Sequence, residues 1–71
     1  MILRSQIKDK AREKGFDNAN QLSTQARVGY RSVSAIWEYD TPIGDTKIIT
    51  LEKIARALGV TVTELYIVLG D

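Results

Sequence analysis

The side chains best suited to do chemistry lie in the stretch ARVGYRSVSAIW, residues 26–37. At the 3.6-residue spacing of an α-helix, Val33, Ile36 and Trp37 fall on one apolar face, which we expect to be buried. Trp37 in particular is expected in the core. The outward face then carries a phenol, a guanidinium, a hydroxyl and a methyl group, from Tyr30, Arg31, Ser34 and Ala35. Groups of these kinds donate hydrogen bonds and contact anions and methyl groups.

The composition argues against catalysis, because the chain has neither histidine nor cysteine. The usual general base, the commonest nitrogen ligand for zinc, thiolate metal sites and disulfides are therefore excluded. No calcium-loop spacing, paired carboxylates, nucleophile–base pair or phosphate loop occurs either. We expect no enzyme activity, no metal site and no cofactor.

The chain of 71 residues predicts a single domain over residues 1–71. Its net charge is +1, but residues 1–37 hold seven basic and three acidic side chains, and residues 38–71 hold three and six. The basic half is either an electrostatic footprint for phosphate or an ordinary solvated helix surface. No apolar run is long enough for a bilayer, and MILRSQIKDK has no signal-peptide centre, so a cytoplasmic location is expected.

Apolar periodicity and the residues that start and stop helices predict a compact all-α fold of five short helices. No strand is expected, since the capping box of Thr61 and Glu64 accounts for the strand-like VTV run. Gly15 and Gly59 act as helix stops. The predicted helices are Ile2–Lys14, Ala19–Ala26, Tyr30 to Glu38 or Tyr39, one that begins after Asp45 or Thr46 and stops at Gly59, and Val62–Leu69.

The second and third predicted helices have the features of a helix-turn-helix. The second must cross the third closely, and Ser23 is small enough to allow this. The turn between them is short, and Val28 is an apolar residue that we expect to be tucked beneath it. In such a motif the third helix enters the major groove of DNA while the second crosses the backbone.

Two segments resemble a known family. QLSTQARVGYRSVSAIW is similar to the opening, turn and recognition helix of the lambda-repressor-like domains, the Cro and phage-repressor or XRE-type class. TLEKIARALGVTVTELY is similar to the last two helices of that family and is the more specific match. The resemblance implies a DNA-binding transcriptional regulator of the repressor type, with double-stranded DNA as its partner.

Positions within the helix-turn-helix divide into two sets of candidate contacts. Base contacts are expected from the outward face of the third helix, with Arg31 forking onto guanine and Ala35 against a methyl group. The full base-contact set is Tyr30, Arg31, Ser34 and Ala35. Phosphate contacts are expected at four places: the start of the second helix, the turn after it, the flank of the third helix and the start of the fourth. In that order the residues are Asn18, Asn20 and Gln21, then Arg27, Ser32 and Lys47.

The tail ELYIVLGD is apolar on all sides of a predicted helix end. Leu65 and Leu69 are expected to face the core, which leaves Ile67 or Val68 exposed. The residue exposed is either a scattered surface apolar side chain or the contact of a weak homodimer, and we favour the homodimer. The alternative function is a helical protein-interaction module, antitoxin-like or adaptor, that keeps the fold without binding DNA.

Overall fold

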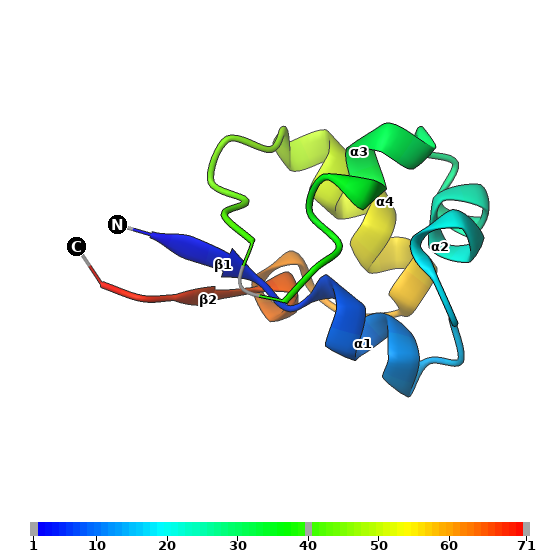
Figure 1. The fold of residues 1–71 in the computed structure, drawn as a ribbon, viewed down its shortest axis with the longest axis horizontal. Helices are drawn as coiled ribbons and strands as arrows, with labels where there is room; N and C mark the ends of the chain where they lie inside the picture. The colour runs from blue at the N-terminus through cyan, green and yellow to red at the C-terminus, as the bar shows by residue number, and fades with distance from the viewer. Residues whose placement is uncertain (1, 40, 71) are drawn as a thin grey trace.

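Four α-helices and one two-stranded antiparallel sheet make up the fold in the computed structural model, which describes residues 2–39 and 41–70 (Figure 1). None of the helices in this described part is long and apolar enough to cross a membrane. In chain order the elements are β1 (Leu3–Ser5), α1 (Ile7–Glu13), α2 (Ala19–Ala26), α3 (Tyr30–Ser34), α4 (Ile48–Leu58), the 3-10 turn η1 (Val62–Leu65) and β2 (Tyr66–Val68).

The predicted all-α, five-helix fold is wrong at both ends of the chain. The expected helix Ile2–Lys14 begins instead with β1, and only its second part is α1. The expected helix Val62–Leu69 is one 3-10 turn followed by β2. Leu69, expected to be buried one helical turn after Leu65, is 51% exposed.

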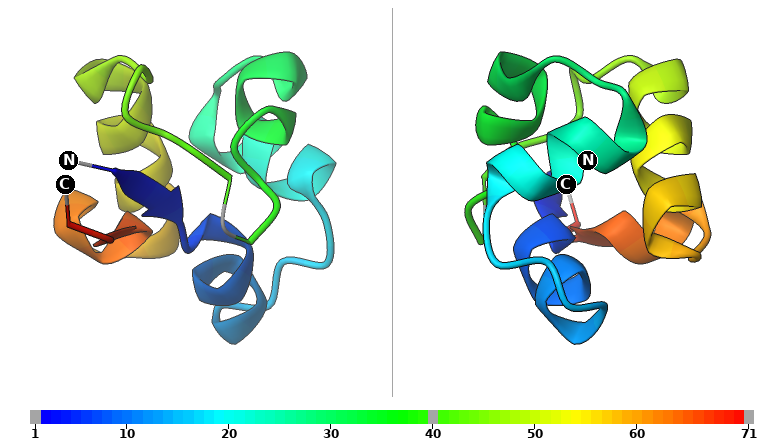
Figure 2. Two further views of the ribbon diagram at one scale, coloured as in Figure 1. Left: turned by 60° about the vertical axis from the view of Figure 1, so that its left-hand side comes forward. Right: turned by 90° about the vertical axis from the view of Figure 1, so that its right-hand side faces the viewer.

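The two strands form because segments from opposite ends of the chain pair with each other. Leu3 lies opposite Val68, Arg4 opposite Ile67 and Ser5 opposite Tyr66. The run YIV is aromatic and β-branched, which suits an extended strand once a partner is available. Both termini therefore lie side by side at one end of the molecule (Figures 1 and 2).

The third helix is shorter than the predicted span to Glu38 or Tyr39. Its regular part ends at Ser34, and Ile36 and Trp37 follow in a tighter turn. The buried hydroxyl of Ser5 donates to the Ile36 carbonyl at 2.6 Å. Because the chain must then reach the second edge of β1, where Thr41 O accepts from Ser5 N at 2.8 Å, a longer helix is excluded.

Local helix signals were predicted correctly. Gly15 and Gly59 end their helices with positive φ values of 91° and 71°. The carboxylate of Glu64 accepts from the Thr61 N–H at 2.8 Å, which confirms the capping box, although the segment it opens is a single 3-10 turn. Such signals depend only on neighbouring residues, so they survive the rearrangement of the ends.

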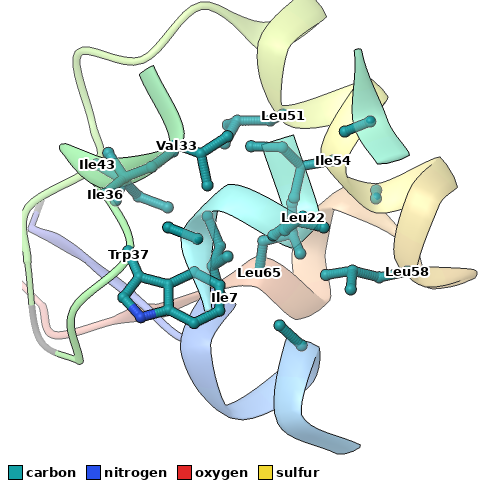
Figure 3. Packing of buried hydrophobic residues seen from close by; sticks show 14 residues of the cluster. Ile7, Leu22, Val33, Ile36, Trp37, Ile43, Leu51, Ile54, Leu58 and Leu65 are labelled. Carbon is teal, nitrogen blue, oxygen red and sulfur yellow. The ribbon is translucent and has the colours of Figure 1, made fainter. Parts of the chain in front are cut away.

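The core is one cluster to which every helix contributes (Figure 3). Trp37 is buried, as expected, and closes one side of the cluster beside Ile7. Ile43, from the loop before α4, is also buried, because its N–H donates to Leu3 O at 3.0 Å and anchors the loop on β1. The core thus holds α2, α3 and α4 in fixed positions.

Candidate nucleic-acid interface

α2 carries a small buried residue, Ser23, and a tight turn joins α2 to α3. Ser23 is buried, and its hydroxyl donates to the Asn20 carbonyl at 2.8 Å, so its polar atom is satisfied within α2. Arg27 ends α2 in the left-handed conformation, with φ 58° and ψ 42°. The next N–H, of Val28, returns to Ser23 O at 3.1 Å, and the Val28 side chain packs partly buried against the core.

The outward face of α3 is open to solvent. Val33 is fully buried, whereas Tyr30 is 53% exposed. Arg31, Ser34 and Ala35, the other predicted base-contact residues, are exposed as well. Ala35 lies just beyond the end of α3 but keeps helical backbone angles, and its N–H donates to Arg31 O at 3.0 Å. The structure therefore brings all four predicted base-contact residues to one short, exposed helix and its last turn.

The cations around this helix are not neutralised within the described part of the chain. Residues 18–37 contain no Asp or Glu. The ion pairs among described residues lie elsewhere, joining Lys8 with Glu38, Lys10 with Glu13, and Arg56 with Glu52. Arg27, Arg31 and Lys47 are exposed and take part in none of these pairs. An anion that approaches α3 meets free positive charge.

An open groove of about 360 Å³ runs between the end of α3 and the start of α4. It brings together two predicted phosphate-contact residues, Ser32 and Lys47, with the predicted base-contact residue Ala35. Thr46 and Thr50 complete its polar lining, and Ile36 also lines it. A groove lined by one lysine and three hydroxyl residues can hold a phosphate oxygen by charge and by hydrogen bonds.

Thr46 and Thr50 were missed by the sequence analysis. Their signal was available, because a helix from Lys47 onward places Thr50 three residues later on the same face as Lys47. What could not be predicted is that the loop of residues 41–46 turns this face toward α3. That turn depends on the pairing of the loop with β1, a contact between residues far apart in the sequence.

The predicted phosphate contacts at the start of α2 form a separate group. Asn18 caps α2, with its side-chain oxygen accepting from Gln21 N at 2.9 Å. The Gln21 side chain accepts from Asp17 N at 2.8 Å, one residue earlier than a capping box requires. Asn20 is exposed and its side chain is not used in the cap. These three residues do not line the groove.

No group of His, Cys, Asp and Glu side chains that could hold a metal ion occurs in residues 2–39 and 41–70. Comparisons with protein-family models, curated proteins and solved structures found no match to this chain. A proposal for the function therefore rests on the geometry of α2, α3 and the groove, together with the resemblance in the sequence.

Proposed function

We propose that the chain binds double-stranded DNA in a sequence-specific manner, with α3 in the major groove, and acts as a transcriptional regulator of the repressor type. The observation that carries the proposal is the outward face of α3. Tyr30, Arg31 and Ser34 are all exposed on it, while Val33 fixes the helix to the core. The repressor assignment follows from the resemblance to Cro and phage repressors alone.

In this arrangement the two groups of contacts have different tasks. Arg31 extends toward the base edges, where its guanidinium can donate two hydrogen bonds to guanine. The groove of Ser32, Lys47 and Thr50 takes a phosphate on one side of α3, and the start of α2 takes one on the other. Phosphates held on both sides would set the depth and register of α3 in the groove.

The test is fluorescence polarisation with labelled duplexes at low and moderate salt. Binding is expected at low salt and should weaken as salt rises, because each phosphate contact releases counterions. The dependence on salt should be gentle, because few cations make such contacts. Once a preferred duplex has been selected from a random pool, Arg31→Ala should cost about 1–3 kcal/mol of binding free energy and relax the preference at one base position.

The matched control is Arg56→Ala, because Arg56 is an exposed cation on α4 that lies outside the α3–α4 groove. It should leave affinity and base preference unchanged. Equal losses on every duplex for Arg31→Ala would reassign Arg31 to phosphate. No detectable binding at low salt would contradict the proposal.

The second candidate is the helical protein-interaction module, antitoxin-like or adaptor. It is favoured by Ile48 and Ile49 at the start of α4, which are 65% and 58% exposed. Two adjacent exposed isoleucines on a helix suit contact with another protein better than contact with DNA. Absence of DNA binding at low salt, together with a folded chain, would favour this candidate.

A further inference from the structure

The outward face of α3 offers a narrow choice of groups for reading a base. Residues 29–37 contain no Asn, Gln, Asp or Glu. Amides pair with adenine and carboxylates accept from the amino group of cytosine, so α3 lacks the side chains that recognise these two bases directly. The next carboxylate along the chain, of Glu38, lies 3.1 Å from the ammonium group of Lys8 on α1. Apart from hydroxyl groups, the exposed face of α3 offers the Arg31 guanidinium for guanine and apolar groups for the C5 methyl of a pyrimidine.

Arg31 and Ala35 are placed to contact neighbouring base pairs. They are four residues apart and so lie on the same side of the helix. The Ala35 N–H donates to Arg31 O at 3.0 Å, and Ala35 has φ −63° and ψ −24°, so the helical spacing continues beyond Ser34. One helical turn advances about 5.4 Å, and successive bases are about 3.4 Å apart. A group that contacts Ala35 therefore lies about one or two base pairs from a guanine bound by Arg31.

Ala35 lies at the border between the base-contact face and the α3–α4 groove. It lines the groove together with Ser32 and Lys47, two predicted phosphate-contact residues. In the major groove, the C5 position of a pyrimidine lies nearer to its own sugar–phosphate backbone than the O4 or N4 group does. A small apolar side chain beside a phosphate seat is therefore placed to contact the C5 position.

We propose that α3 recognises a guanine through Arg31 and, about one or two base pairs away, the C5 methyl group of a pyrimidine through Ala35. This inference rests on the proposed DNA binding and adds the class of site that is bound. Because α3 has no carboxylate to accept from the amino group of cytosine, the methyl group decides which pyrimidine is accepted. Thymine and 5-methylcytosine are both accepted, and unmethylated cytosine is disfavoured. Methylation of a cytosine beside the guanine thus strengthens binding at that site.

The first test changes the DNA and leaves the protein as it is. In the preferred duplex selected from a random pool, each thymine is replaced in turn by deoxyuridine, which lacks only the C5 methyl group. At one thymine near the guanine whose preference Arg31→Ala relaxes, affinity measured by polarisation should fall about fourfold, because one methyl group is no longer buried. The other thymines of the duplex are the matched controls, and their replacement should change affinity little.

The second test exchanges the same thymine–adenine pair for a cytosine–guanine pair, with and without the C5 methyl group on the cytosine. The methylated duplex should bind about fourfold more tightly than the unmethylated one, for the same reason. Ala35→Gly removes the methyl group of the protein and should bring this ratio toward one, while the preference for guanine remains. The ratio is measured within each variant, so a loss of helix stability in Ala35→Gly does not affect it.

The outcomes separate this inference from the proposed function. Equal affinity for thymine and deoxyuridine at every position, or for cytosine and 5-methylcytosine at the exchanged pair, would overturn the inference while DNA binding stands. A selected site without thymine near that guanine would do the same. An unchanged ratio in Ala35→Gly would overturn the role of Ala35. Absence of binding to every duplex at low salt would overturn both proposals.

Discussion

Arg27 is the one described residue other than glycine with a positive φ. A side chain in the left-handed conformation costs roughly 1–2 kcal/mol, and glycine escapes this cost. Strain of this kind persists where the surrounding structure holds it, and it is found most often at functional sites. Arg27 is exposed beside α3, and a phosphate contact by its side chain would account for the strain.

The substitution Arg27→Gly separates the steric cost of the left-handed conformation from the contribution of the side chain to phosphate binding. We expect it to raise the free energy of unfolding by about 1 kcal/mol, because the turn keeps its conformation without the steric cost. DNA binding should weaken on all duplexes alike, with a smaller dependence on salt. Chemical denaturation and polarisation measure the two quantities, and Arg27→Lys is the control that keeps both the charge and the strain. A variant that gains stability without losing affinity would show that Arg27 makes no phosphate contact.

The fold perturbs the titration of Glu64. The hydrogen bond from the Thr61 N–H, joined by the Thr61 hydroxyl and the nearby charges of Lys10 and Lys14, holds the pKa of its carboxyl below its ordinary value of 4.5, against a smaller opposing effect of burial. A carboxyl with a lowered pKa in the folded state stabilises the fold when it is ionised. That contribution is complete above pH 4.5 and is lost as the pH falls through the lower, folded-state pKa.

Glu64→Gln keeps an acceptor for the Thr61 N–H but removes the charge. The wild-type chain should therefore be more stable than the variant near neutral pH, and the difference should shrink as the pH falls below 4.5. Urea unfolding of both chains across the acid range measures this difference. A difference that stays constant from neutral to acid pH would mean that the charge of Glu64 has no part in the cap.

At the scale of elements, Ser5 ties three segments together. Its hydroxyl donates to Ile36 O at 2.6 Å and accepts from Ile7 N at 3.1 Å, so β1, the start of α1 and the turn after α3 meet at one buried atom. Ser5→Ala leaves both backbone groups without this partner in a buried position. We expect a loss of roughly 1–3 kcal/mol in the free energy of unfolding, measured by denaturation. Ser32→Ala, at an exposed position, should change stability much less.

Ser5 also shows where prediction from the sequence stops. The spans of α2 and α4, the stops at Gly15 and Gly59 and the cap at Thr61 follow from residues within one or two turns of each other, and they were predicted. β1 and β2 form through a pairing between the two ends of the chain, which helical periodicity cannot reveal. The length of α3 depends in turn on β1, so the predicted end of α3 lies further along the chain than the observed end at Ser34. The side chains of the candidate site were identified from the sequence, but the groove that gathers Ser32 and Lys47 was not.

At the scale of the whole molecule, the candidate interface and the edge of β2 differ in charge. The face formed by α2 and α3 has exposed cations and no acidic residue between positions 18 and 37. The edge of β2 is uncharged and apolar. Val68→Ala, a change at the β2 edge, should therefore leave the DNA affinity of the monomer unchanged, as measured by polarisation.

The most direct test of the central claim is a titration of the ¹⁵N-labelled chain with a short duplex at low salt, followed by the shifts of backbone amide signals. We predict the largest changes at the start of α2, at residues 29–35 and at residues 46, 47 and 50, which line the groove, with little change in β1 and α1. Changes centred on the exposed isoleucines at the start of α4 or on β2, with α3 unaffected, would contradict it, as would the absence of any change.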